Sequence, residues 1–204
     1  MASIILRLLA VLVLQSILVG ATTVAQAQPK VEMHRVGVSA DDGSGWHLAV
    51  SSKGSFSIRL PIPFNDFTIL DPSTGEATYV VGGKSSEGIK FSVAELPAAG
   101  KKPKDMATIL ESFSSKPANK VSDVSRDTGN DADVLSFSVV NATSTAHIRY
   151  IQTKRALYTL TIECPIAYRD LVAANKEKFF ESFKLKAKSS AAGAFPHKRI
   201  VRVA

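Results

Sequence analysis

Apolar and polar residues alternate along much of the chain from Trp46 onward, with the period of two that is typical of β-strands. The alternation begins at Trp46, Leu48 and Val50, and it resumes over residues 56–60 after a short turn. Two prolines follow and end this hairpin, because proline has no N–H to donate to a strand ladder. A second hairpin is predicted from alternating segments at residues 77–81 and 89–96, which are joined by a glycine-rich turn at residues 82–88.

Helical periodicity appears in two places further along the chain. Apolar residues recur at helical spacing from Met106 to Phe113, and Asp105 directly before them is a candidate N-cap. A second stripe follows Pro165 and runs from Tyr168 to Phe183. Residues spaced by three or four lie on one face of a helix, so both stripes predict amphipathic helices that pack on a core.

Alternating segments also lie between the two helical stripes, at residues 120–126, 134–140, 146–153 and 157–163. The predicted order is therefore strands, a helix, further strands and a second helix. Strands that are joined as hairpins form an antiparallel sheet, whose apolar faces must be covered. We expect one α+β domain over residues 46–186, in which two amphipathic helices cover an antiparallel β-sheet.

The N-terminal end has the pattern of an export signal. An apolar run over residues 8–19 follows Arg7, and the small residues Ala25 and Ala27 fit the site that signal peptidase cleaves. The run is shorter than the roughly 20 apolar residues that span a bilayer. We expect residues 1–27 to be a signal peptide and the product to be periplasmic or extracellular; a retained membrane anchor is the alternative.

The segments that flank the predicted domain are poor in sustained patterns. Residues 28–45 contain few apolar positions and are expected to form a flexible N-terminal segment, and residues 187–204 a basic disordered tail. In the tail Lys198, Arg199 and Arg202 alternate with apolar residues. These three cations predict a weak contact with an anionic membrane surface.

The positive charge of the chain is concentrated at its C-terminal end. Lys and Arg number 25 against 18 Asp and Glu, a formal net charge of +7. Arg7 and the cations from Lys184 onward account for the whole excess, so residues 28–183 are formally neutral. Nucleic-acid binding requires a basic surface, and we therefore expect no nucleic-acid partner.

Three segments resemble the PsbP-like family: GSFSIRLP at 54–61, RALYTLTI at 155–162 and FFESFKL at 179–185. The resemblance extends over roughly residues 46–185, and with the export signal it indicates the small exported bacterial branch of unknown role. It implies an α/β/α sandwich around an antiparallel sheet. Members bind protein partners or have no known activity, so the resemblance implies a binding role and transfers no catalytic residue.

Residues capable of chemistry are scattered along the sequence. The four histidines, at positions 34, 47, 147 and 197, form neither a close pair nor a metal-ligand motif, and we expect no metal and no cofactor. Cys164 is the only cysteine, so no intramolecular disulfide can form. Its apolar surroundings predict a buried, unreactive thiol. No catalytic residue is assigned.

Three functions are consistent with these observations. The first is an exported, non-enzymatic binding or accessory protein with a protein partner in the cell envelope. The second is a hydrolase assembled across the sheet, which predicts a concave pocket where His147 or His47 lies within hydrogen-bond reach of a carboxylate and a serine. The third is attachment to anionic lipid or cell-wall polymer through the basic tail.

Overall fold

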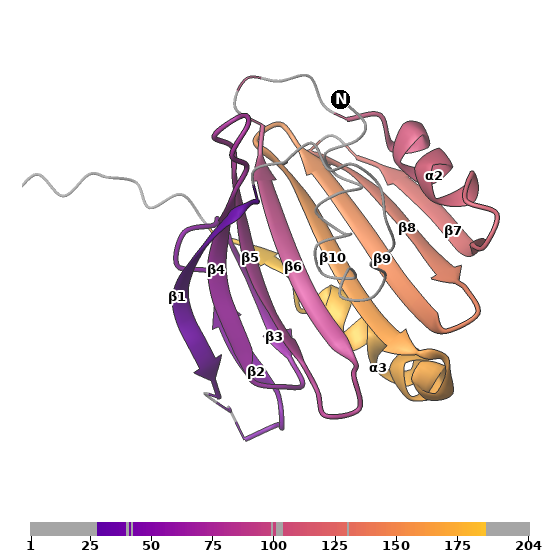
Figure 1. The fold of residues 1–204 in the computed structure, drawn as a ribbon, viewed down its shortest axis with the longest axis horizontal. Helices are drawn as coiled ribbons and strands as arrows, with labels where there is room; N and C mark the ends of the chain where they lie inside the picture. Colours follow the sequence, from indigo (N-terminus) through magenta and orange to yellow (C-terminus); the bar gives the residue numbers. More distant parts are fainter. Residues whose placement is uncertain are drawn as a thin grey trace, which may run out of the picture.

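A computed structural model describes residues 28–39, 41, 43–98, 100, 104–129 and 131–186. Within these ranges the chain forms eleven β-strands in two antiparallel sheets, together with two α-helices and a short 3-10 turn. Figure 1 shows the eight strands of the large sheet side by side, in the order β1-β4-β5-β6-β10-β9-β8-β7. Strands β1 and β7 are therefore its two edges.

The large sheet contains long strands that pair mostly with their neighbours in sequence. Their bounds are β1 (Lys30–Val38), β4 (Phe64–Leu70), β5 (Ala77–Lys84), β6 (Lys90–Pro97), β7 (Lys120–Thr128), β8 (Ala132–Val140), β9 (Ser144–Thr153) and β10 (Ala156–Pro165). The small sheet has the order β11-β3-β2, with β2 (His47–Val50), β3 (Phe56–Leu60) and β11 (Lys184–Leu185). The helices are α2 (Met106–Ser114) and α3 (Arg169–Glu181), and the 3-10 turn Ile166–Tyr168 leads into α3.

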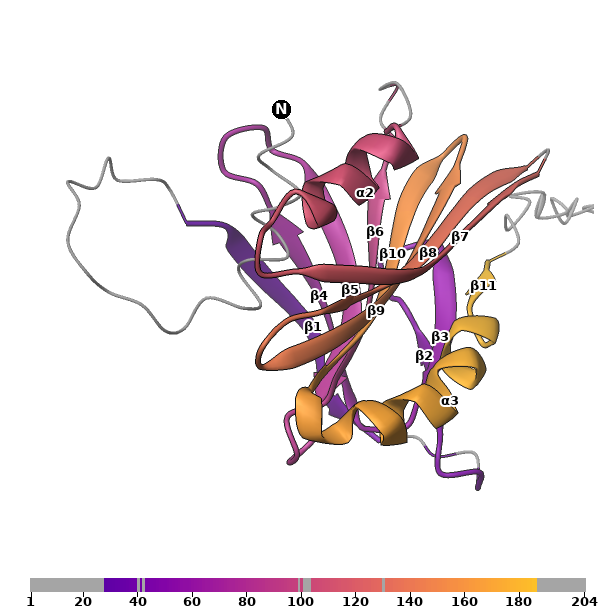
Figure 2. The ribbon, with the colours of Figure 1, turned by 90° about the vertical axis from the view of Figure 1, so that its right-hand side faces the viewer.

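Two apolar clusters lie on opposite faces of the large sheet. Figure 2 shows α2 on one side of this sheet and α3 with the small sheet on the other. Strand β10 contributes to both clusters because its side chains alternate: Leu157 packs in the α2 cluster, whereas Tyr158, Leu160 and Ile162 pack in the other. Leu160 and Ile162 are fully buried. The central strand therefore couples the two halves of the core.

The predicted α+β fold is wrong. The described residues form a predominantly antiparallel β structure, and its two α-helices contain only 9 and 13 residues. One face of the large sheet is shared between α3 and the three-stranded sheet, a second β layer that the sequence analysis did not predict. The α/β/α sandwich implied by the PsbP-like resemblance is therefore not the observed architecture.

Two strands of the large sheet, β1 and β4, were not predicted. The segment 28–45 was expected to be flexible, yet Lys30–Val38 pairs with β4 as an edge strand. An edge strand leaves many side chains in solvent, as Met33 shows with 48% exposure, so its sequence lacks a clear apolar face. In β4 the pattern is obscured because Asp66 and Thr68 point inward, with 0% and 4% exposure.

The glycine pair of the second hairpin was placed in the turn but belongs to a strand. Strand β5 continues through Gly82 and Gly83, and the turn begins at Ser85, whose backbone N–H donates to Ile89 O at 2.8 Å. A Cβ at Gly83 would lie 2.3 Å from the carbonyl oxygen of Pro63. Glycine is therefore required here by close backbone approach rather than by turn geometry.

Several local predictions are confirmed. The apolar residues Met106, Ile109 and Phe113 of α2 are buried, and Asp105 is its N-cap, accepting a hydrogen bond from Ala107 N at 3.0 Å. Cys164 is a buried free thiol with 1% exposure. The helical and strand patterns thus identified which side chains face the interior in these elements.

The two chain ends on which export and attachment were predicted are not part of this description. Residues 1–27 and 187–204 both lie outside the described residues. Among the helices that the structure describes, none has the length and apolar character needed to cross a membrane.

Candidate functional site

A polar strip lies on the face of β8 and β9 that turns away from α2. Phe137 and Ile148 pack in the α2 cluster, so the residues next to them in sequence point to the opposite face. In the antiparallel register Ser138 lies directly opposite His147, and Ser136 lies opposite Arg149. Directly opposed side chains on one face of a sheet are close enough to interact.

A hollow of about 100 Å³ separates this strip from α3. We call it the His147 hollow. Its charged and hydrogen-bonding lining comes from β7, β8, β9 and α3, and includes Asp123, Ser138, His147, Arg149, Lys176 and Glu177. The lining therefore combines segments that are well separated in the sequence.

Three of these side chains form a hydrogen-bonded chain. Ser138 Oγ lies 2.9 Å from Asp123 Oδ2 and 2.8 Å from His147 Nδ1. Asp123 occupies a bulge of β7 and has a φ of 53°, a left-handed conformation that aspartate tolerates better than most residues. The bulge thus sets the carboxylate beside Ser138, at a backbone cost of about 1 kcal/mol.

The positions of the hydrogens in this chain follow from its chemistry. An ionised carboxylate can only accept, so Ser138 donates its single hydrogen to Asp123. Ser138 Oγ must then accept from His147, which places the ring hydrogen of the neutral imidazole on Nδ1. Nε2 therefore carries a lone pair, and it is buried without a hydrogen-bond partner among the described residues.

The surroundings of His147 favour its neutral form. The residue is 8% exposed, and burial is the main cause that lowers the pKa of the imidazole below its usual value. The nearby charge of Lys176 lowers the pKa further, whereas Asp123 and Glu177 oppose it more weakly. At neutral pH His147 is thus an uncharged hydrogen-bond acceptor.

Arg149 forms a fixed wall of the hollow. Its Nε donates to Ser136 Oγ at 3.0 Å, and its Nη2 lies 3.4 Å from Glu177 Oε2 on α3. The guanidinium carbon lies 4.4 Å from the ring centroid of Phe180, a cation–π contact that further orders the side chain. Helix α3 and strand β9 are thereby joined beside His147.

The residue types predicted for a hydrolase pocket are present, but the order of their hydrogen bonds differs from that of a catalytic triad. Ser138 lies within hydrogen-bond reach of both His147 and the carboxylate of Asp123. In a Ser-His-Asp triad the histidine lies between the other two and removes the serine proton. Here Ser138 lies in the middle and donates to Asp123, so the arrangement is not that of a catalytic triad.

The structure separates the other sequence candidates from this hollow. His34 donates to or accepts from Thr68 Oγ1 at 2.7 Å on the β1 side of the large sheet. His47 begins β2 in the small sheet, where its Nδ1 is buried without a partner in the described part of the chain. The tail cations Lys198, Arg199 and Arg202 lie outside the described residues.

In the described ranges no group of three or more His, Cys, Asp or Glu side chains is close enough together to hold a metal ion.

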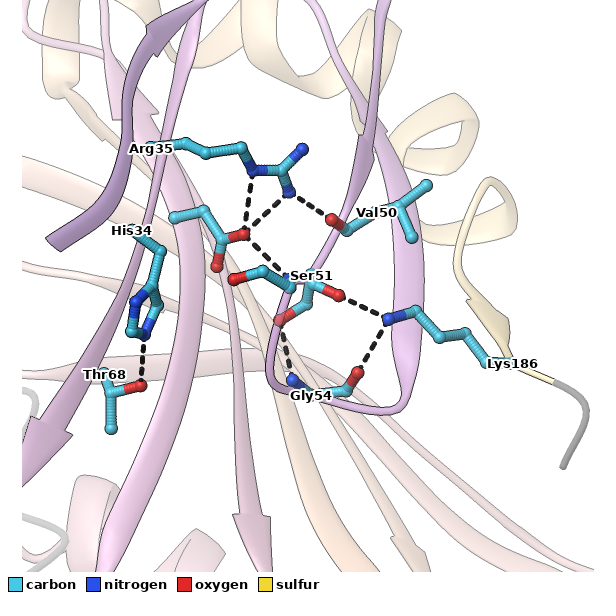
Figure 3. A network of polar contacts seen from close by, with 9 residues as sticks. His34, Arg35, Val50, Ser51, Gly54, Thr68 and Lys186 are labelled. Atoms are coloured by element: carbon cyan, nitrogen blue, oxygen red, sulfur yellow. Dashed lines mark hydrogen bonds and ion pairs between the residues drawn. The ribbon is translucent and has the colours of Figure 1, made fainter. Parts of the chain in front are cut away.

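A second polar cluster, at the β2–β3 connection, was missed by sequence reasoning (Figure 3). Asp66 Oδ2 accepts from Arg35 Nη2 at 2.7 Å and from the backbone N–H of Ser52 at 2.8 Å. Lys186, at the end of the described chain, donates to the carbonyl oxygens of Ser51 and Gly54. These bonds join the small sheet to β1 and β4, so we interpret the cluster as structural.

Taken together, the fold and the His147 hollow define an antiparallel β protein with a small polar hollow between its large sheet and α3. No protein-family model matches the sequence, and no curated protein shows significant similarity to it. The relationship to PsbP-like proteins therefore stays a prediction, and the architecture that it implied is the part that the structure contradicts.

Proposed function

We propose that this chain is an exported, non-enzymatic binding protein of the cell envelope, and that it recognises its partner through the His147 hollow. The observation that carries the proposal is the polar hollow itself, whose lining brings Ser138, His147 and Arg149 of the sheet together with Lys176 and Glu177 of α3. Sites that bind ligands combine a concave shape with a few polar side chains that fix the orientation of the ligand. The apolar N-terminal run and its small-residue cleavage pattern support export.

Retention of an envelope component on the immobilised protein tests the binding role. The full chain would be produced in an exporting bacterial host, and a labelled envelope extract would be passed over it. We expect the wild type and His34→Gln to retain the same component and His147→Phe to lose it. Equal retention by wild type and His147→Phe would refute recognition through the hollow.

Export of the protein is tested by a separate measurement, the identity of its N-terminal residue. N-terminal sequencing of the protein from the periplasmic or secreted fraction should return Gln28 as the first residue. An intact N-terminus in the membrane fraction would instead support the retained anchor.

A further inference from the structure

The residues of the small sheet carry positive charge and no negative charge. Residues 46–65, which include β2 and β3, contain Lys53 and Arg59 but neither Asp nor Glu. Residues 182–204, which include β11, contain six further Lys and Arg residues and again no acid. The two segments together contribute a formal charge of +8, so the remainder of the chain from residue 28 carries −2. The small sheet and the tail that follows it are therefore the basic part of the protein.

The outer face of the small sheet adds exposed apolar side chains to this charge. Leu48 and Val50 alternate in β2 with a fully buried alanine, so they point away from the large sheet, and they are 47% and 41% exposed. In the antiparallel register Leu48 lies opposite Arg59. Ser57 of β3 lies between Val50 of β2 and Lys184 of β11. Apolar and cationic residues thus share this outer face.

The acids that bind the β2–β3 turn do not reach the outer face. Asp66 and Glu95 accept hydrogen bonds from backbone N–H groups of this turn, but they belong to the large sheet and are 0% and 6% exposed. Lys186 donates to two backbone carbonyl oxygens of the turn, which carry no formal charge (Figure 3). The turn therefore leaves the positive charge of the small sheet in place.

The acid of the neighbouring edge strand is already paired. Glu32 of β1 lies 2.7 Å from Lys30, which is the main cause that lowers the pKa of Glu32, and Lys53 contributes least to that effect. Lys53 and Lys184 are both exposed to solvent. The outer face of the small sheet consequently presents cations together with apolar side chains to its surroundings.

An anionic lipid surface accommodates both features. Each cation close to such a surface is attracted to the headgroups and raises the affinity about fivefold. Exposed apolar side chains gain from entering the boundary between headgroups and acyl chains, whereas a soluble polyanion has no apolar phase to receive them. Leu48 and Val50 therefore favour a lipid surface over a charged polymer.

We infer that the outer face of the small sheet docks the exported protein on an anionic lipid surface. We call this face the small-sheet patch; its residues are Leu48, Val50, Lys53, Arg59 and Lys184. The inference goes beyond the proposed function, because the patch shares no residue with the His147 hollow. The tail cations follow Lys186 in sequence and would add to the attraction.

Cosedimentation with lipid vesicles tests the inference. The protein purified after export would be mixed with phosphatidylcholine vesicles that contain or lack phosphatidylglycerol, at low and at high salt. We expect saturable binding to the vesicles with phosphatidylglycerol at low salt, weaker binding at high salt, and little binding to phosphatidylcholine alone. Equal binding to both kinds of vesicle, or no binding to either, would overturn the inference.

Charge variants locate the contact on the folded domain. The double variant Lys53→Gln/Lys184→Gln should weaken binding about 25-fold, which is about fivefold for each cation removed. Lys120→Gln/Lys154→Gln is the matched control, because it removes the same charge from exposed positions of the large sheet, and it should bind as the wild type does. If replacement of the tail cations alone removed binding while the patch variant kept it, attachment would lie in the tail and the inference would be wrong.

Apolar variants distinguish a lipid surface from a charged polymer. Leu48→Thr/Val50→Thr keeps strand-forming residues at two exposed positions and should weaken vesicle binding by about tenfold. Val124→Thr, at a position of β7 that is 51% exposed, is the control and should bind normally. Unchanged binding of the double variant would mean a purely electrostatic contact and would refute docking on lipid.

The inference and the proposed function fail separately. His147→Phe should bind the vesicles as the wild type does, and the patch variants should still retain the envelope component. Loss of vesicle binding in His147→Phe would contradict the assignment of lipid binding to the small-sheet patch.

Discussion

Asp66 and His147 are both buried polar residues, and they differ in the hydrogen bonds that they make within the protein. Asp66 Oδ2 receives hydrogens from Arg35 and from the Ser52 backbone within the protein. His147 Nε2 has no such partner in the described part of the chain. Asp66 Oδ1 is likewise buried without a partner there, so the two residues differ in the bonds that they do make: Asp66 binds a charged guanidinium, whereas His147 bonds to a neutral hydroxyl.

Replacement of Asp66 by Asn should therefore reduce stability. The change removes the charge that pairs with Arg35, whose side chain is 37% exposed and can regain some hydration. We expect the free energy of unfolding to fall by about 3 kcal/mol, at the lower end for a broken buried pair. Urea unfolding measures this loss. Asp133→Asn is the matched control, because Asp133 lies 3.9 Å from Arg126 at the surface and should cost less than about 1 kcal/mol. Similar losses in the two variants would contradict the structural role of Asp66.

His147 should make stability depend on pH in a defined direction. Its pKa in the folded protein is lowered, chiefly by burial, below the value of about 6.5 of an unperturbed histidine. As the pH falls through 6.5, the histidine of the unfolded chain binds a proton before that of the folded protein does. The free energy of unfolding therefore decreases from this pH down to the folded pKa, and it does not decrease further below it. The charges that face the ring are Lys176, Asp123 and Glu177.

Comparison of the wild type with His147→Phe isolates this contribution, because the other titrating groups are common to both proteins. As the pH falls from 7 to 5, the unfolding free energy of the wild type should decrease relative to that of His147→Phe. Urea unfolding followed by Trp46 fluorescence at each pH measures it. A difference that is constant over this range would show that His147 is not held neutral by the fold.

At the scale of the elements, β5 packs closely against the β3–β4 connection. This close packing, and not the geometry of a turn, is the reason for glycine at position 83. Gly83 pairs with Phe91 across the ladder to β6, and the Pro63 carbonyl occupies the place where a side chain would begin. The bulge at Asp123 in β7 is a comparable device, because it turns one carboxylate toward the hollow at a sheet edge. Both features belong to the pairing of strands rather than to any one strand.

Gly83→Ala should accordingly be destabilising. The added methyl group would meet the backbone oxygen of Pro63, which cannot move without shifting the connection, and we expect a loss of roughly 1–3 kcal/mol. Thermal unfolding followed by circular dichroism measures it. Gly129→Ala is the control: its Cβ would lie 3.6 Å from Ala132 O, and stability should be unchanged or raised by up to about 1 kcal/mol. An unchanged midpoint for Gly83→Ala would refute the close approach.

At the scale of the whole molecule, the two apolar clusters are expected to unfold together. They lie on opposite faces of one sheet, and β10 contributes alternate side chains to both. The single tryptophan, Trp46, belongs to the cluster on the α3 side, so its fluorescence reports on the half that does not contact α2. A change made under α2 should therefore be detected at Trp46.

Phe113→Ala provides this test. Phe113 packs edge-on against Phe137 with centroids 5.1 Å apart, and its truncation should cost about 3–5 kcal/mol. We expect the urea midpoints from Trp46 fluorescence and from far-ultraviolet circular dichroism to fall by the same amount. Glu111→Ala, an exposed position on the same helix, should change stability by less than about 0.5 kcal/mol. A Trp46 transition that did not move would mean that the two halves unfold independently.

The local pattern of the sequence was sufficient for the elements whose inward residues are apolar. It placed most strands, the buried face of α2 and the burial of Cys164, because the period of apolar residues follows directly from the geometry of one strand or helix. It failed at β4, where Asp66 and Thr68 face inward, and at β1, where an edge strand needs few apolar residues.

The sequence alone therefore determined most of the extended and helical segments, β1 and β4 excepted, and which of their apolar residues avoid water. Only the tertiary structure decided that β2 and β3 form a separate sheet, and that Asp123, Ser138 and His147 meet beside α3. The physical reason is the separation along the sequence of the residues that interact. Alternation is a property of neighbouring residues, whereas strand partners, bulges and the burial of a particular nitrogen depend on contacts between distant segments.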